Sequence, residues 1–123
     1  MHAFPSASEL AFLVGREIQQ ICLDPWSVQF RFRPAGQITV ESLFEHVTAS
    51  GEVYRHEVGN REGGPLFLYE FMQQTIADIA VQDDWLTLVM ANGARLRIFA
   101  EVGGQYESGQ IHETDDLRFC TVF

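Results

Sequence analysis

Residues 76–99 carry the clearest strand–turn–strand pattern of the chain, and this pattern constrains the fold more than any other feature. Apolar and polar side chains alternate on both sides of Gly93, which is the period of half-buried β-strands. A two-residue loop would place apolar residues on the same face as arginines. A three-residue loop over residues 91–93 instead pairs Leu88 with Leu96 and requires a left-handed conformation only at the glycine. We therefore predict an antiparallel hairpin with the three-residue loop.

The other face of this hairpin is unusual for a surface that would meet water. Aromatic residues and arginines, which this face combines, are enriched in protein interfaces. The alternative is that a short helix or the C-terminal segment covers this face within the monomer. The candidate interface residues are Trp85, Val89, Arg95, Arg97 and Phe99.

An earlier segment repeats the hairpin pattern in residues 26–41. A shift of 58 residues, from Ile18 to Ile76, places apolar residues on apolar residues before both hairpins, and one inserted residue then aligns Trp26 with Trp85. We interpret this as an internal duplication; the alternative is a chance match of two amphipathic hairpins. The two repeats cover approximately residues 6–58 and 65–123.

Each repeat is predicted to begin with a short helix. Ser6 and Glu9 have the spacing of a capping box. Pro65 suits the first turn of a second helix over residues 66–74. The expected fold class is therefore α+β: a single domain, mainly antiparallel β-sheet with two short helices, built from two tandem α-β-β(-β) repeats.

The remaining segments have shorter and weaker patterns. Residues 43–47 have helical spacing, residues 53–58 predict a strand, and residues 106–111 are expected to pair with the strand that precedes them. Alternating apolar residues from Leu117 to Phe123 predict a last strand. The pattern leaves open whether the halves form one sheet, a sandwich or a partly closed barrel.

Charge excludes some classes of partner. The chain of 123 residues has a net charge of −9 and contains no lysine. Such acidity disfavours nucleic acid and anionic membranes, because binding to either depends on cations of the protein. A basic partner stays compatible, and so does the simpler reading that acidity keeps the protein soluble. With no secretory signal or membrane span in the sequence, we expect a cytoplasmic location and reduced cysteines.

No arrangement of residues predicts catalysis. Glu45 and His46, with His56 and Glu57 across a turn, come nearest to a metal cluster, but surface histidines beside glutamates are common. Serine elbows, glycine-rich phosphate loops and calcium loops are missing from the sequence. We therefore expect no catalytic residue, no metal site and no cofactor.

The pattern Leu-x-x-Leu-Val-Gly-Arg-x-Ile over residues 10–18, the two hairpins and the later Tyr106-Glu107-Ser108 resemble a family of small uncharacterised bacterial proteins, a domain of unknown function. The resemblance covers most of the chain and implies no activity for any residue. Size and acidity are also similar to those of immunity proteins that neutralise toxins.

Two classes of function follow as hypotheses. The first is a non-enzymatic cytoplasmic protein-interaction module, which binds its own copy or a basic partner, as an immunity protein would. The alternative is a small-ligand binder or an enzyme with a pocket between the two repeats. Such a pocket would be lined by polar residues that converge on it, with the candidates His46, His56, Glu41 and Cys22.

Overall fold

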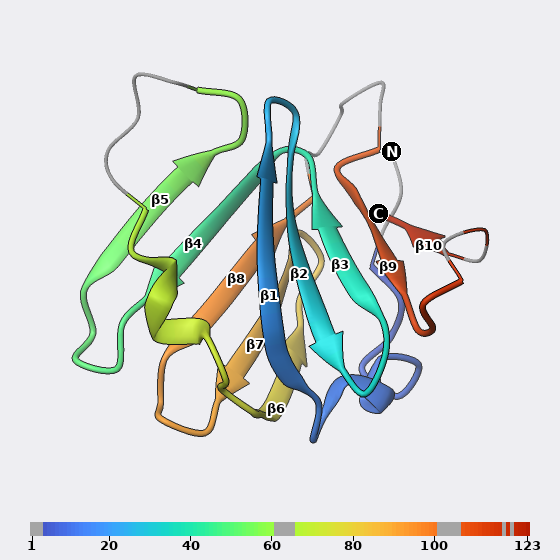
Figure 1. Ribbon diagram of the computed structural model, residues 1–123, viewed down its shortest axis with the longest axis horizontal. Helices are drawn as coiled ribbons and strands as arrows, with labels where there is room; N and C mark the ends of the chain where they lie inside the picture. The colour runs from blue at the N-terminus through green and yellow to red at the C-terminus, as the bar shows by residue number, and fades with distance from the viewer. Residues whose placement is uncertain (1–3, 61–65, 101–106, 117, 119) are drawn as a thin grey trace.

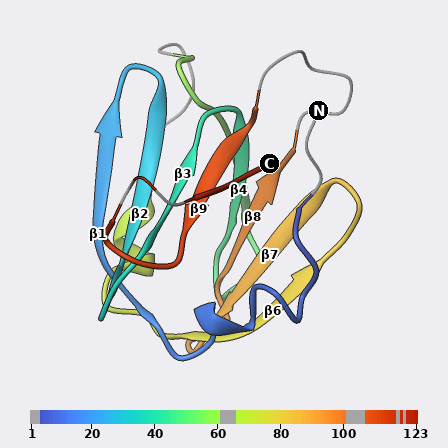
Figure 2. The same cartoon turned by 90° about the vertical axis from the view of Figure 1, so that its right-hand side faces the viewer.

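The computed structural model describes residues 4–60, 66–100, 107–116, 118 and 120–123. Within these residues the strands form two antiparallel five-stranded sheets that face each other (Figures 1 and 2). Sheet A contains, in spatial order, β1 (Glu17–Asp24), β2 (Ser27–Arg33), β3 (Gln37–Val40), β9 (Gly109–His112) and β10 (Thr121–Val122). Sheet B contains, in spatial order, β5 (Val53–Glu57), β4 (Leu43–Val47), β8 (Arg95–Phe99), β7 (Trp85–Met90) and β6 (Ile76–Val81). The architecture is therefore mainly antiparallel β-sheet, arranged in two layers.

The space between the sheets is filled by the apolar side of each strand. Phe30 from sheet A meets Phe44 from sheet B edge to face, with ring centroids 5.7 Å apart. Both are fully buried, as are Leu88 and Ile98. The middle of the space between the sheets is thus packed, and a pocket between them has to lie at its margin.

The second hairpin has the predicted register. Leu88 pairs with Leu96, and Trp85 pairs with Phe99. Gly93 has a φ of 91°, the left-handed conformation that the three-residue loop requires. Local alternation was sufficient to find this register, because a slip of one residue would turn the apolar side chains to the outer face.

The two predicted helices are wrong. In their place are two 3-10 turns, η1 (Ala11–Leu13) and η2 (Leu68–Phe71). Leu10 and Leu13 are both buried, and a spacing of three residues places side chains on one side of a 3-10 turn. Each turn ends at a residue in extended conformation. The segments are therefore too short for their hydrogen bonds to offset the free-energy cost of helix nucleation. The described residues are therefore β-sheet and turns rather than α+β.

The segments related by the 58-residue shift have the same local geometry. Both β1 and β6 contain a bulge, after Ile18 and after Ile76 respectively. Leu23 pairs with Val28, as Val81 pairs with Leu86, so the shift stays at 58 through the turn and the predicted inserted residue is wrong. Trp26 lies in the β1–β2 turn, whereas Trp85 begins β7, and the two tryptophans are not counterparts.

The first strands of the two segments meet at one corner of the sandwich, where their hydrogen bonds are reciprocal. The N–H of Gly15 donates to the carbonyl of Ile76, and the N–H of Gln73 donates to the carbonyl of Ile18, each over 2.8 Å. Gly15 and Gln73, which the shift relates, both have positive φ. The corner therefore has the symmetry of a local two-fold axis.

Two strands of each half belong to the sheet of the other half. β4 pairs with β8 and carries β5 on its other side, and β9 pairs with β3, where Ile38 is opposite Ile111. The prediction that residues 106–111 pair with the preceding strand is wrong, because β9 pairs with β3 and β10; residue 106 lies outside the described residues. Residues 43–47, which have helical spacing in sequence, form β4 because Phe44 and His46 alternate inward.

Candidate functional site

The predicted interface residues lie together on the outer face of sheet B. Val89 is opposite Arg95, and Trp85 contacts Phe99 with ring centroids 5.7 Å apart. Trp85 is 39% exposed, and the others are half-buried. Neither 3-10 turn covers this face, because each packs at an edge between the two sheets (Figure 1).

Charges on this outer face are largely paired within the chain. The carboxylate of Glu45 lies 3.5 Å from Arg97 and 3.7 Å from Arg55. The guanidinium of Arg55 also lies over the ring of Phe99, 5.7 Å from its centroid. These contacts use the same groups that an interface would offer to a partner.

A buried histidine lies on the inner face of sheet B, beneath η2. His46 is 1% exposed, and its Nε2 lies 2.6 Å from Oε1 of Glu70. The other carboxylate oxygen of Glu70 accepts a hydrogen bond from the N–H of Ala49. The ring of Phe71 packs on the histidine at 4.3 Å between centroids. Glu70 thereby fastens η2 to the end of β4.

A second histidine lies beside the first, on β5. His56 is 9% exposed and opposite Phe44, and the ring centroids are 5.2 Å apart. Its Nε2 and the Nδ1 of His46 have no hydrogen-bond partner among the described residues. Burial, and then the proximity of His46, lowers the pKa of His56, so its ring is neutral at pH 7.

The two histidines and two glutamates that come nearest to a metal cluster in the sequence do not gather in the structure. Both histidines point inward from their strands, whereas Glu45 and Glu57 lie on the opposite face. In the part of the chain that the structure describes, no three His, Cys, Asp or Glu side chains are placed to hold a metal ion.

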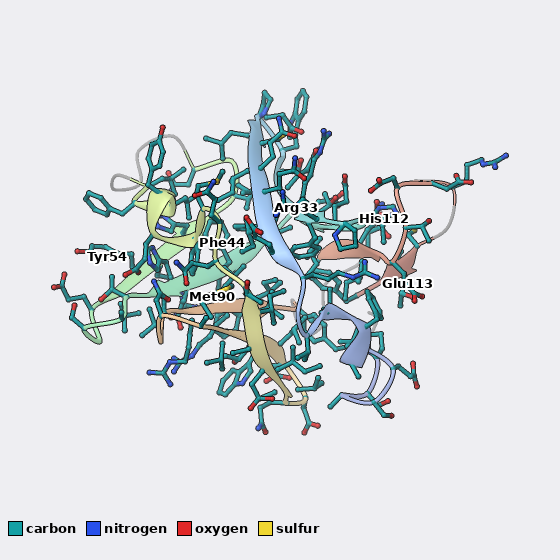
Figure 3. All side chains as sticks on the ribbon, turned by 60° about the horizontal axis from the view of Figure 1, so that its bottom comes forward. Arg33, Phe44, Tyr54, Met90, His112 and Glu113 are labelled. Atoms are coloured by element: carbon teal, nitrogen blue, oxygen red, sulfur yellow. The ribbon has the colours of Figure 1, made fainter. Side chains whose placement is uncertain are left out.

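A pocket of about 570 Å³ opens beside His56, at the edge of the sandwich between the β1–β2 turn and the end of β5. This volume is within the usual range of ligand pockets. Of the four residues expected to line a pocket between the halves, His56 lines this one and Glu41 lines a neighbouring hollow. Figure 3 shows Phe44, part of the pocket floor, near the centre of the molecule and Tyr54 at the outer end of the same sheet. The lining residues are Leu23, Asp24, Pro25, Val28, Phe44, Arg55, His56, Glu57, Val58, Gly59, Asn60 and Leu66.

Exposed apolar side chains line this pocket or the hollow beside it, or are next in sequence to residues that do. A second hollow, of about 350 Å³, shares Leu23 and Leu66 with it and continues to Met72. Large exposed apolar patches on soluble proteins mark binding surfaces. We call the pocket and these side chains the β1–β5 mouth. The exposed residues and their exposed fractions are Leu23 (60%), Trp26 (78%), Leu66 (41%), Phe67 (49%) and Tyr69 (92%).

The opposite edge of the sandwich, between β6 and β10, has apolar residues where the mouth has histidines. Ile111 is opposite Ile38, and His46 is opposite Leu96, the residue that the 58-residue shift relates to Ile38. Ile111 is therefore the counterpart of His46. Phe123 is the counterpart of His56, because it exchanges backbone hydrogen bonds with Gly109 in the way that His56 pairs with Phe44. The 58-residue shift makes Phe12 the counterpart of Glu70.

At that opposite edge, which we call the closed edge, a ring covers the counterpart of His56, and a smaller hollow of about 280 Å³ lies between η1 and the strands β9 and β10. Phe4 stacks on Phe123 with ring centroids 4.6 Å apart, and both rings are buried. Val81, the counterpart of Leu23, packs against the core. The counterparts of Leu66, Phe67 and Tyr69 are Ser8, Glu9 and Ala11.

The mouth is acidic at its rim. Asp24 and Glu57 line the pocket, and Glu41 and Asp84 line the neighbouring hollow. Partial burial raises the pKa of Glu41, and the negative charges of Glu107 and Asp24 raise it further. Carboxylates gathered in this way favour a cation nearby.

The sequence contained one signal for the mouth that pattern reading missed. The 58-residue shift aligns Leu66-Phe67 with Ser8-Glu9, so apolar residues before the second hairpin correspond to polar residues before the first. The contact of His46 with Glu70 left no such signal, because it joins a strand and a turn that lie far apart in sequence.

Among the described residues, no helix has the length and apolar character needed to cross a membrane. Comparisons with protein-family models, with curated proteins and with solved structures found no match to this chain.

Proposed function

We propose that the chain is a non-enzymatic binding module and that it binds a basic protein partner at the β1–β5 mouth. The observation that carries this proposal is the exposure of Leu23, Leu66 and Tyr69 around an open pocket, whereas Phe4 covers the corresponding position at the opposite edge. Exposed apolar residues with an acidic rim fit a partner that combines apolar and cationic groups.

Site-specific photocrosslinking tests the proposal in cells that produce the protein natively. A photoreactive phenylalanine replaces Tyr69 in one variant and Ala11, its counterpart and likewise exposed, in another. We expect a discrete protein adduct from position 69 alone, and its loss when Leu66 and Phe67 become serine. Equal adducts from both positions, or an adduct that survives the serine substitutions, would contradict the proposal.

A small-ligand binder or an enzyme is the competing class, and it would use the same pocket. His56 is the one observation that favours it, because its buried Nε2 lacks a partner among the described residues. A small molecule that copurifies with the protein and protects His56 from modification would support this class. The serine substitutions at the exposed rim would then leave binding unchanged.

The outer face of sheet B supports a second candidate, self-association through Trp85, Val89, Arg95, Arg97 and Phe99. Its support is the exposed edge of Trp85 beside Phe99. Sedimentation velocity at micromolar concentration is expected to show a dimer that Trp85→Ala weakens. A monomer at every concentration, unchanged by the substitution, removes this candidate.

We also infer that the two halves descend from tandem copies of one segment. The bulges after Ile18 and Ile76 and the reciprocal hydrogen bonds of Gly15 and Gln73 support this inference. Duplication followed by divergence explains how one edge of the sandwich stayed closed while the other acquired the mouth.

A further inference from the structure

The closed edge shows how one aromatic ring seals such a mouth. Phe4 precedes η1 and belongs to neither sheet, yet its ring stacks on Phe123 at an interplanar angle of 24° and is 9% exposed. The ring of Phe123 lies over Gly109, so closely that a Cβ at this glycine would collide with it. A single ring from outside the sheets therefore covers the position that corresponds to His56 at this edge.

The β1–β5 mouth has no equivalent ring in its own sequence. The 58-residue shift aligns Phe4 with Glu62, and residues 61–65 contain no aromatic side chain. Leu23 is 60% exposed, whereas its counterpart Val81 packs against the core. The apolar groups that a ring would cover are thus present and uncovered.

The groups that line the mouth suit a flat apolar ring at the centre and cations around it. His56 and Phe44 present two rings at the floor, and Leu23 and Leu66 flank the opening. At the rim, Arg55 is the one cation among the described lining residues, and it lies near Glu45. The carboxylate of Asp24 accepts hydrogen bonds from the N–H groups of Trp26 and Ser27 and adds its negative charge to the rim. The carboxylates of Glu57 and, close by, Glu41 add further negative charge that favours cationic groups.

Resting on the proposed function, we infer that the partner inserts one aromatic side chain into the β1–β5 mouth, against His56 and between Leu23 and Leu66. The inserted residue belongs to a segment that also carries lysine or arginine. An aromatic anchor seated in a desolvated pocket is the common form of an interface hot spot. Stacking on the rings of the floor adds to the burial of apolar area.

Selection from a phage-displayed library of random peptides, with the whole chain as target, tests the inference. The enriched peptides are expected to contain one Phe, Tyr or Trp flanked by Lys or Arg. Alanine in place of the aromatic residue should weaken binding at least about tenfold. Leu23→Ser should weaken it similarly, since Leu23 is too exposed for this change to unfold the chain. Val14→Ser, at the exposed apolar residue that follows η1, should leave binding unchanged.

The site of binding is read from the ring resonances of His56 by NMR. Peptides that bind at the mouth through aliphatic anchors would overturn the inference while the proposed function stands. Peptides that leave His56 unperturbed, or a library without enrichment over the Leu23→Ser variant, would overturn the proposed function as well.

Discussion

The two edges of the sandwich are built on the same backbone plan and finished in opposite ways. Between β6 and β10, the inner residues are apolar, the polar Ser8 and Glu9 stand where the other edge has Leu66 and Phe67, and Phe4 covers Phe123. Between β1 and β5 the order is reversed: Glu70 and His46 lie inside, and Leu66, Phe67 and Tyr69 face out. A closed edge needs only to be stable. The reversed polarity makes the edge between β1 and β5 less favourable to fold, and a binding role explains why these residues lie there.

The largest expected effect separates the two edges by their contribution to stability. Phe4→Ala removes a buried stacked ring and should lower the free energy of unfolding by about 3 kcal/mol. Leu66→Ala trims an exposed side chain at the other edge and should change it by less than about 0.5 kcal/mol. Urea denaturation of both variants measures the difference. Equal losses would mean that both edges are closed by their own residues.

The next effect concerns the polar pair inside the mouth. Glu70→Ala leaves Nε2 of buried His46 without its partner and should cost about 1–3 kcal/mol. The double variant His46→Ile with Glu70→Phe copies Ile111 and Phe12 from the closed edge, and it should recover most of that loss. If the double variant is less stable than Glu70→Ala, residues from the closed edge cannot replace their counterparts in the mouth, and the comparison of the two edges fails at this position.

The smallest effect is a dependence of stability on pH. Because the pKa of His56 is lowered from 6.5, the unfolded chain binds more protons than the native chain just below that pH. The free energy of unfolding should therefore fall as the pH drops below 6.5. His56→Phe, which copies Phe123, should remove part of this fall between pH 7.5 and pH 5.5, about one proton at most.

Other groups near His56 titrate or carry charge in both proteins, so the comparison of His56→Phe with the wild type isolates the histidine. Identical dependence on pH in the two proteins would show that its ring is not held neutral by the fold. The neighbouring groups are His46, Glu70, Asp24, Glu57 and Arg55.

Local pattern was sufficient where the structure itself is local. The pairing of Leu88 with Leu96 follows from alternation and from one glycine, since a hairpin joins residues that are close in sequence. The 3-10 turns were misread as helices because a capping pattern says where a helix can start and not whether enough residues follow. In η1, Gly15 ends the segment after one turn.

Features that depend on distant residues could not be predicted. The pairing of Ile38 with Ile111 joins strands with all of sheet B between them in sequence. Alternation assigns each strand a face and says nothing about which neighbour it chooses. Likewise, nothing in the sequence indicates that His46 and Glu70 will be hydrogen-bonded to each other. The candidate site lies at such distant contacts, and for this reason it emerged only with the structure.

The exchange of strands between the halves has a consequence for the order in which the protein forms during synthesis. All of sheet B lies within residues 43–99, so it can assemble as soon as that stretch has left the ribosome. Sheet A waits longer, because β3 keeps an unpaired edge until β9 and β10 emerge near the C-terminus. A nascent chain stalled before Gly109 would thus present β3 as a free strand edge, the type of surface through which incomplete chains aggregate.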